Sequence, residues 1–234
     1  MIRTYTWPTP NGHKVHIMLH ECGLEHEIIP VDITDGAQFA PEFLAISPNN
    51  RIPAIVDTDG PDGGTISVFE SGAILYYLAR KTGRFLPDET ADPGHHFATM
   101  EWLMWQMGGV GPMMGRANHF RRYAPDRIEY ATERYANETR RLFGVADSRL
   151  AGTRYLVGDD YTIADMAAFP WMRHWKGQEV PLEEYPNVKR WLDEIGARPA
   201  VKSGLEVLIE HRSSTPPKGK AWDVMFGKEQ LKRR

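Results

Sequence analysis

The sequence has one cysteine, no long apolar run and little net charge, and each shortage excludes a class of protein. Cys22 has no partner for a disulfide within the chain, which is typical of a protein in a reducing compartment. No apolar run approaches the about 20 residues that a membrane-spanning helix needs. The first five residues, Met-Ile-Arg-Thr-Tyr, lack the order of a signal peptide. We therefore expect a cytoplasmic protein with no membrane partner.

The formal net charge of −3 gives the whole chain no footprint for nucleic acid, so we expect no nucleic-acid partner. The charge is uneven, because residues 213–234 hold six basic and two acidic side chains. This basic C-terminal extension is a candidate for contact with RNA or a membrane. We favour a solvated basic end, with the apolar anchors Trp222, Val224, Met225 and Phe226 docked on the protein.

What is present suits a globular protein of 234 residues, 41% of them hydrophobic and 25% charged. Strand and helix patterns alternate over the first 80 or so residues, which predicts an α/β domain. The expected strands are residues 2–5, 27–31, 52–57 and 65–69, and the expected helices are 15–22, 41–46 and 70–81. The glycine-rich turn between the last two strands predicts an antiparallel hairpin.

The sequence changes character at residues 83–93, where turn residues replace periodic patterns, and everything beyond reads as helical. Residues 96–107 are apolar nearly all round, so we expect a buried helix there that Gly108–Pro112 interrupts or kinks. Apolar stripes with a period of 3.6 predict further helices over 125–150 and from Val188 to Ile195. The domain prediction is 1–83, 93–212 and the extension 213–234.

A sharper signal marks the start of one helix. In Tyr161-Thr162-Ile163-Ala164-Asp165-Met166, the Thr162 hydroxyl can cap the helix while the Asp165 carboxylate reaches back to the Thr162 N–H. Tyr161 and Met166 can pack across this capping box as a hydrophobic staple.

Four motifs in this order resemble the glutathione transferase superfamily: Thr9-Pro10-Asn11-Gly12, Ile52-Pro53, Glu70-Ser71 and the Thr162–Asp165 capping box. The match is closer to bacterial nu-class-like enzymes that have glutathione-dependent disulfide-bond reductase activity. The resemblance implies a thioredoxin-like α/β N-terminal domain, an all-α C-terminal domain, a homodimer, and glutathione or its disulfide as co-substrate.

Two of these motifs suit two parts of a glutathione molecule, its central cysteinyl residue and its γ-glutamyl end. A cis Ile52–Pro53 bond would turn the Ile52 backbone outward to pair with the cysteinyl residue of glutathione as an added strand. Glu70 can pair with the γ-glutamyl ammonium, while the Ser71 hydroxyl and the helix N-terminus bind the carboxylate. The alternatives are a proline that only starts a strand and a serine that only caps a helix.

Further residues follow from the resemblance. Gln38, Asn50 and Arg51 lie on loops that it brings near the glycyl end of glutathione, and Arg134 matches an arginine that contacts glutathione. Arg51 and Arg134 can also be ordinary solvated side chains.

The glutathione sulfur needs donors, because the thiolate is the nucleophile and the chain has no Cys-Pro-x-Cys motif. The Thr9 hydroxyl and the Asn11 amide precede or open the first helix, and the resemblance places them on the sulfur as catalytic residues. Their alternative role is to cap that helix. Tyr5 could be a thiol-activating tyrosine, but an aromatic residue inside a strand more often packs in the core. Cys22 could be a redox cysteine, but a free cysteine on the apolar side of a helix is usually buried and inert.

The histidines at positions 13, 16 and 20 have helical spacing but lack ligands to complete a tetrahedral site, so we expect no metal. The function that the resemblance implies is reduction of a small disulfide by bound glutathione. Conjugation of glutathione to an electrophile and cleavage of a thioether would use the same half-site. The other alternative is a non-catalytic binding module of the same fold, in which the glutathione positions should be degraded; here they are intact, which favours the enzyme.

Overall fold

The computed structural model describes residues 1–213 and 215–231 of the chain. Contacts divide it into two compact units, residues 1–77 with the chain from 204 onward, and residues 78–203. The domain boundaries predicted from the sequence, 1–83, 93–212 and 213–234, stay a prediction. Lys232, Arg233 and Arg234, which we expected to be solvated, lie outside the described residues.

The first unit is built on a four-stranded sheet with the order β2-β1-β3-β4. The strands are β1 (Ile2–Thr6), β2 (His26–Pro30), β3 (Ala54–Asp57) and β4 (Ile66–Phe69). β1 runs parallel to β2 and antiparallel to β3, and β3 and β4 form the expected antiparallel hairpin. All four residues of β3 are buried, as a central strand requires. The four predicted strands are confirmed, with ends shifted by one or two residues.

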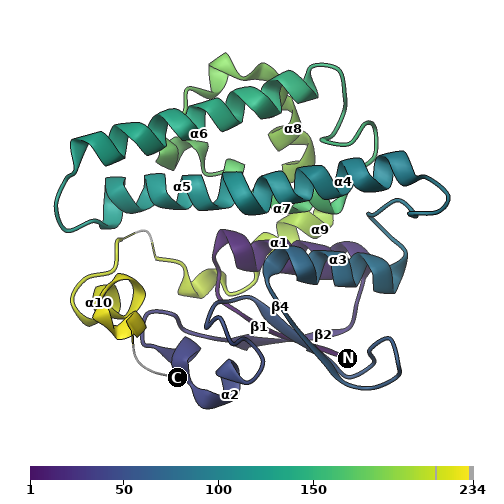
Figure 1. Cartoon of the computed structure of the whole chain (residues 1–234), viewed down its shortest axis with the longest axis horizontal. Helices are drawn as coiled ribbons and strands as arrows, with labels where there is room; N and C mark the ends of the chain where they lie inside the picture. Colours follow the sequence, from purple (N-terminus) through teal and green to yellow (C-terminus); the bar gives the residue numbers. More distant parts are fainter. Residues whose placement is uncertain (214, 232–234) are drawn as a thin grey trace. The chain divides into compact units, whose positions relative to one another are not determined.

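Helices cover both faces of this sheet, with α1 and the first turns of α3 on one face and α2 on the other (Figure 1). Their bounds are α1 (Pro10–Cys22), the 3-10 turn η1 (Ala37–Phe39), α2 (Pro41–Leu44) and α3 (Ser71–Thr82), whose last turn belongs to the second unit. α1 ends as predicted at Gly23, which adopts a left-handed φ of 65° and donates to carbonyls of the last turn.

α1 is buried over every residue from Gly12 to Leu19, because it packs closely against neighbouring backbone. A Cβ on Gly204 would lie 2.8 Å from the Ile17 nitrogen, so only glycine allows the chain after 203 to approach α1. His16 Nε2 lies 2.9 Å from the Thr6 hydroxyl oxygen and fixes the other side of the helix to β1.

The second unit is helical throughout, as predicted. Its helices are α4 (Pro93–Trp105), the π-helical turn η2 (Gln106–Val110), α5 (Gly111–Asn118), the π-helical turn η3 (His119–Tyr123), α6 (Glu129–Leu150), α7 (Ile163–Met172), the 3-10 turns η4 (Trp175–Gln178) and η5 (Leu182–Glu184), α8 (Pro186–Ala197) and α9 (Pro199–Glu206), which ends in the first unit. The expected interruption near Gly108 is the π-helical turn η2. It joins α4 directly to α5, so the helical path continues with a local change of hydrogen-bond register.

Two details of the helical prediction are wrong. α4 is not buried all round, because Phe97 and Met104 are 56% and 55% exposed and only a narrow stripe faces α7. The helix predicted over 125–150 begins only at Glu129, because Ile128 precedes it and is exposed, and its buried residues begin at Thr139. On α8, Val188, Trp191, Leu192 and Ile195 are buried, as the apolar stripe predicts.

The capping box at the start of α7 is confirmed. The Asp165 carboxylate is fully buried and accepts from the Thr162 N–H at 3.0 Å, the Thr162 hydroxyl at 3.1 Å, the Leu156 N–H at 3.0 Å and the Trp191 Nε1–H at 2.8 Å. Burial raises the pKa of this carboxyl, while the four hydrogen bonds act in the opposite direction. Asp165 thus ties α7, α8 and the loop before α7 together.

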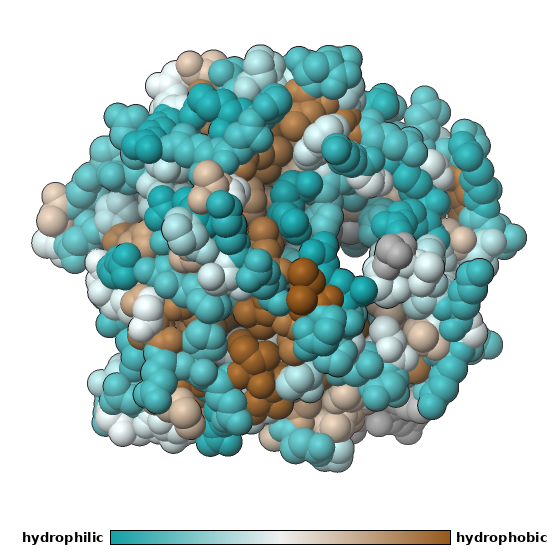
Figure 2. Space-filling model, turned by 180° about the vertical axis from the view of Figure 1, so that it is seen from behind, coloured by the Kyte–Doolittle hydropathy of each residue, from teal (hydrophilic) through white to brown (hydrophobic). Residues whose placement is uncertain are grey.

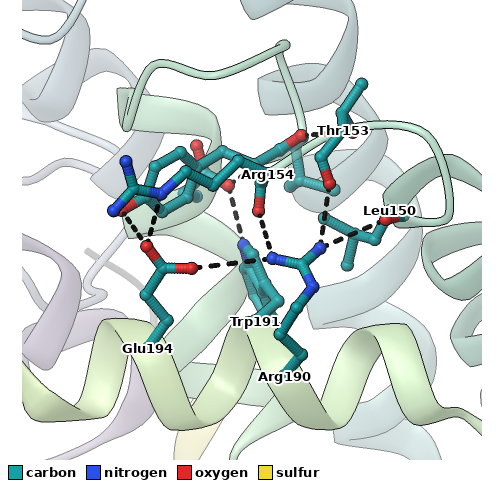
Figure 3. A network of polar contacts seen from close by, with 9 residues as sticks. Leu150, Thr153, Arg154, Arg190, Trp191 and Glu194 are labelled. Carbon is teal, nitrogen blue, oxygen red and sulfur yellow. Dashed lines mark hydrogen bonds and ion pairs between the residues drawn. The ribbon is translucent and has the colours of Figure 1, made fainter.

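Polar side chains of α8 hydrogen-bond to the loop that leads from α6 to α7 (Figure 3). Arg190 donates to the carbonyls of Leu150, Thr153 and Arg154 at 2.9–3.1 Å. Glu194 accepts from Arg154 Nε at 2.6 Å. Side chains of one helix therefore satisfy the backbone of a loop that has little structure of its own.

The C-terminal segment folds onto the first unit through α10 (Lys220–Phe226), after the 3-10 turn η6 (Ile209–His211) and before η7 (Lys228–Leu231). Val224 is 4% exposed and approaches Gly36, whereas Trp222 and Phe226 are half-buried. Of the predicted apolar anchors, Val224 is therefore the buried one. Figure 2 shows a face of the molecule on which hydrophilic residues predominate. Among the described residues, no helix is both long and apolar enough to cross a membrane.

Ending the chain after Arg212 is expected to lower the unfolding temperature by a few degrees, because removal of Val224 uncovers apolar surface near Gly36. Burial of one such side chain contributes about 1.5–3 kcal/mol. Thermal unfolding followed by circular dichroism measures the change. Hydrogen exchange that is fast throughout 220–231 in the full chain would contradict docking of α10.

Candidate functional site

The sheet brings the predicted glutathione residues to one edge. Ala54 pairs with Tyr5 on one side and with Phe69 on the other, and Thr6 pairs with Pro30. The carboxyl ends of β1, β2 and β4 therefore meet the amino end of β3. The segments that follow or precede these ends carry every predicted site residue of the first unit.

At the start of β3, the Ile52–Pro53 peptide bond is cis, as the sequence predicts. Ile52 is half-buried and packs with Tyr5 against a core cluster of Val31, Phe43 and Ala54. The Tyr5 ring lies 6.3 Å from that of Phe43, which accords with the packing role expected for Tyr5.

At the end of β4, Glu70 is held in a conformation that glutamate rarely adopts, with φ at 71°. Its carbonyl accepts from the Ile74 N–H at 2.9 Å, so Glu70 opens α3 and Ser71 is the first helical residue. Its carboxylate accepts from Asn49 Nδ2 at 3.3 Å, which links it to the loop before Pro53. Left-handed residues of this kind gather at binding sites, where the surrounding structure enforces them.

Beneath Ser71 lies a charged residue that the sequence reading did not single out. Lys14 of α1 is 1% exposed, and its Nζ donates to the Ser71 Oγ at 3.2 Å. Burial lowers the pKa of Lys14 to about 7, although the nearby Glu70 charge acts to raise it. The only sequence signal for Lys14 is its place one residue before the apolar run of this helix, Val15 to Leu19, which His16 alone interrupts.

Beyond β2, Gln38 is 2% exposed and points its amide into the unit. Its Nε2 donates to the Ile33 carbonyl at 3.3 Å, while its buried Oε1 has no hydrogen-bond partner among the described residues. A buried acceptor without a partner calls for a ligand or water donor. Asn50 is also buried, in the left-handed region with φ at 48°.

The two predicted arginines have different surroundings. Arg51 is exposed, and its Nη2 donates to the Gln230 Oε1 of the C-terminal segment at 2.7 Å. Arg134 lies on α6 in the second unit, exposed, with its Nη1 3.7 Å from Glu138. A role for either arginine in glutathione binding stays a prediction.

The two predicted catalytic residues stand at the start of α1. Thr9 is the N-cap, since its Oγ1 accepts from the Gly12 N–H at 3.3 Å, and Asn11 lies half-buried in the first turn. A Cβ on Gly12 would lie 2.3 Å from the Trp7 carbonyl oxygen, so glycine keeps this turn close to the loop before it. Capping explains Thr9 without excluding a second role on sulfur.

Cys22 lies away from this turn, and His16 of the same helix contacts the Thr6 hydroxyl. Cys22 is at the other end of α1, roughly 16 Å from Asn11 at 1.5 Å per residue. Burial lowers the pKa of His16 to about 3, which keeps it neutral. No group of three residues suited to hold a metal ion occurs in the part of the chain that the structure describes.

Comparison with known families gives two matches. Residues 9–81 match the N-terminal domain of glutathione S-transferases, and residues 109–199 match their C-terminal domain. Among curated proteins, the disulfide-bond oxidoreductase YfcG of Escherichia coli is 52% identical over 206 residues, which cover 88% of this chain and 94% of that protein. The disulfide-bond oxidoreductase YghU of the same organism is 42% identical over 217 residues, which cover 87% of this chain and 73% of that protein.

Solved structures that resemble this chain are also glutathione transferases. A glutathione transferase from Burkholderia graminis with two glutathione molecules bound per subunit has a TM-score of 0.84 and 44% identity, covering 88% of each chain. One from Pseudomonas putida with one glutathione disulfide bound per subunit has a TM-score of 0.84 and 42% identity, covering 88% of this chain and 91% of that one.

Proposed function

Since the chain belongs to the glutathione S-transferase family, we propose that it is an enzyme that reduces small disulfides with bound glutathione as the thiol. The observation that supports this most is the single sheet edge where Pro53, Glu70 and the start of α1 converge. The relatives YfcG and YghU carry the name disulfide-bond oxidoreductase, and related structures hold two glutathione molecules or one glutathione disulfide.

In this proposal the γ-glutamyl ammonium pairs with Glu70, and its carboxylate takes the Ser71 hydroxyl and the N–H groups that open α3. The cysteinyl backbone pairs with Ile52 beside Pro53. Gln38, Asn50 and Arg51 receive the glycyl end, where the unpartnered Oε1 of Gln38 accepts a ligand N–H. Arg134 of α6 is a further glutathione contact in the same proposal.

The chemistry uses no protein thiol. Glutathione thiolate attacks one sulfur of the disulfide substrate, the S–S bond breaks, and the departing thiolate takes a proton. A second glutathione thiolate attacks the glutathione sulfur of the mixed disulfide, so that glutathione disulfide and the second product thiol leave. Thr9 and Asn11 donate to the attacking sulfur and favour its thiolate form.

We extend the proposal to a cytoplasmic homodimer that needs no metal, in keeping with the single cysteine and the family. Light scattering tests the dimer. Conjugation to an electrophile would use the same glutathione half-site. Parallel assays with a small dialkyl disulfide and with chlorodinitrobenzene tell the two activities apart, and faster turnover of chlorodinitrobenzene would favour conjugation.

Glu70→Ala is expected to weaken glutathione binding by about 1.5–3 kcal/mol, because the ligand ammonium loses a charge-assisted contact. Isothermal titration calorimetry with glutathione and with its disulfide measures the loss. Glu25→Ala is the matched control, since Glu25 is exposed and precedes β2 at the opposite edge of the sheet. Equal affinities for Glu70→Ala and the unaltered protein would remove Glu70 from the site.

A further inference from the structure

We propose that Lys14 is a positioning residue of the glutathione site, whose ammonium orients the Ser71 hydroxyl toward the γ-glutamyl carboxylate. The inference rests on the proposed function, because it assigns a role within that half-site. Lys14 itself is too deeply buried to be an ordinary surface contact for the ligand.

The geometry fixes the direction of the hydroxyl proton. An ammonium has three donors and no acceptor, so in the 3.2 Å contact the Ser71 oxygen must accept from Lys14 Nζ. The proton of the Ser71 hydroxyl is then directed to another acceptor. Ser71 is the first residue of α3, where the opening backbone N–H groups of a helix have no carbonyl partner within the helix itself. A carboxylate at this position can accept both from these N–H groups and from the hydroxyl.

The charge of Lys14 favours the same ligand. A cation removed from water is costly unless negative charge lies close by. Glu70 supplies part of that charge from the end of β4, yet burial prevails and lowers the pKa of Lys14 to about 7. A bound carboxylate on Ser71 adds a second negative group next to the ammonium. Binding should therefore raise the pKa of Lys14 and take up part of a proton near neutral pH.

The other titratable groups near Lys14 are His13 and His16 on its own helix and Glu70 at the end of β4. On its own helix, the pKa of His16 is lowered to about 3, so His16 stays neutral across the range. His13 is buried one residue before Lys14. Across the contact, Ser71 carries no charge, and Glu70 is the charged group of β4 and α3 that acts on Lys14. His13→Gln in the same series separates any contribution of that histidine.

The test measures the affinity for S-methylglutathione, which has no thiol proton, by calorimetry between pH 6 and pH 9. Lys14→Met keeps the length of the side chain and replaces the buried ammonium by an apolar group. We expect about tenfold weaker binding by Lys14→Met at pH 6.5, in line with the loss of a charged hydrogen bond. The difference from the unaltered protein should shrink toward pH 9, where Lys14 is neutral in the free protein. Lys81→Met, near the exposed end of α3, should change nothing.

Three further readouts separate positioning from mere packing. The double variant of Lys14→Met with Ser71→Ala should bind little more weakly than Ser71→Ala alone, because Lys14 acts through the hydroxyl. Lys14→Met should raise the KM for glutathione more than it lowers kcat. In the unaltered protein, titrations in buffers of different ionisation enthalpy should show proton uptake at pH 7–8, which needs no variant at all.

The inference is wrong if Lys14→Met binds as tightly as the unaltered protein at pH 6.5, or if the unaltered protein takes up no proton. If the unaltered protein binds neither glutathione nor S-methylglutathione, the proposed function itself fails. A Lys14→Met protein that does not fold leaves the proton measurement to decide.

Discussion

Asn11→Ala and Thr9→Ala are expected to slow glutathione-dependent disulfide reduction strongly, whereas Cys22→Ser should retain activity close to that of the unaltered enzyme. A single donor to a developing negative charge contributes about 10²–10³ in rate at an oxyanion, and sulfur accepts hydrogen bonds more weakly, so this range is the upper end. Thr9 is also the N-cap of α1, so Thr9→Ala removes the helix cap as well as the donor to sulfur, whereas Asn11 lies in the first turn and is not the cap. Cys22 lies at the far end of the same helix.

The comparison requires saturating glutathione at a fixed pH, so that a change in affinity is not read as a change in chemistry. Circular dichroism of Thr9→Ala controls for loss of the cap, which costs about 1 kcal/mol by itself. The variant that combines both changes should fall short of the product of the two single effects, since both groups act on one sulfur. Abolished turnover in Cys22→Ser, with Asn11→Ala and Thr9→Ala fully active, would refute a mechanism based on glutathione alone.

Asp165→Ala is expected to lower the free energy of unfolding by on the order of 3–5 kcal/mol, because several buried donors lose their acceptor at about 1–3 kcal/mol each. The stranded groups are the N–H of Leu156, the N–H of Thr162 and the indole N–H of Trp191. Asp165→Asn should be intermediate, since the amide keeps one acceptor oxygen and turns a donor toward the other site.

Urea unfolding followed by tryptophan fluorescence measures this loss, with the midpoint and the slope compared between variants. Asp159→Ala is the matched control, because it removes an exposed carboxylate from the same loop. A change below about 1 kcal/mol in Asp165→Ala would mean that water replaces the carboxylate, as in an exposed site.

The elements that were predicted best are those whose signal lies in residues within one or two helical turns of each other. The stripe from Val188 to Ile195 and the capping box of Asp165 depend on neighbours a turn away, and both are confirmed. α4 was predicted wrongly because apolar side chains occur on all its faces, and a pattern without contrast cannot say which face is buried. Phe97 and Met104 are the residues that show the error.

The site was predictable as a set of motifs but not as an arrangement. Ile52-Pro53 and Glu70-Ser71 are adjacent residues that a reader of the sequence can recognise. The contact of Lys14 with Ser71 joins residues 57 positions apart, and that of Arg51 with Gln230 joins residues 179 apart. The left-handed Glu70 also escaped prediction, because local preference opposes it and only the surrounding fold imposes it.

The single cysteine of the chain, Cys22, limits the disulfides that the protein can form under oxidising conditions. It sits half-buried at the end of α1, with its Sγ 3.9 Å from the Met18 Sδ, and it is the one cysteine of the chain. No ratio of glutathione to glutathione disulfide can therefore close a cross-link within this chain or scramble one. Disulfide exchange can place only one mixed disulfide on Cys22, with glutathione or with a second chain, away from the turn that holds Asn11. The protein can thus work among reactive disulfides without becoming an internally cross-linked product of them.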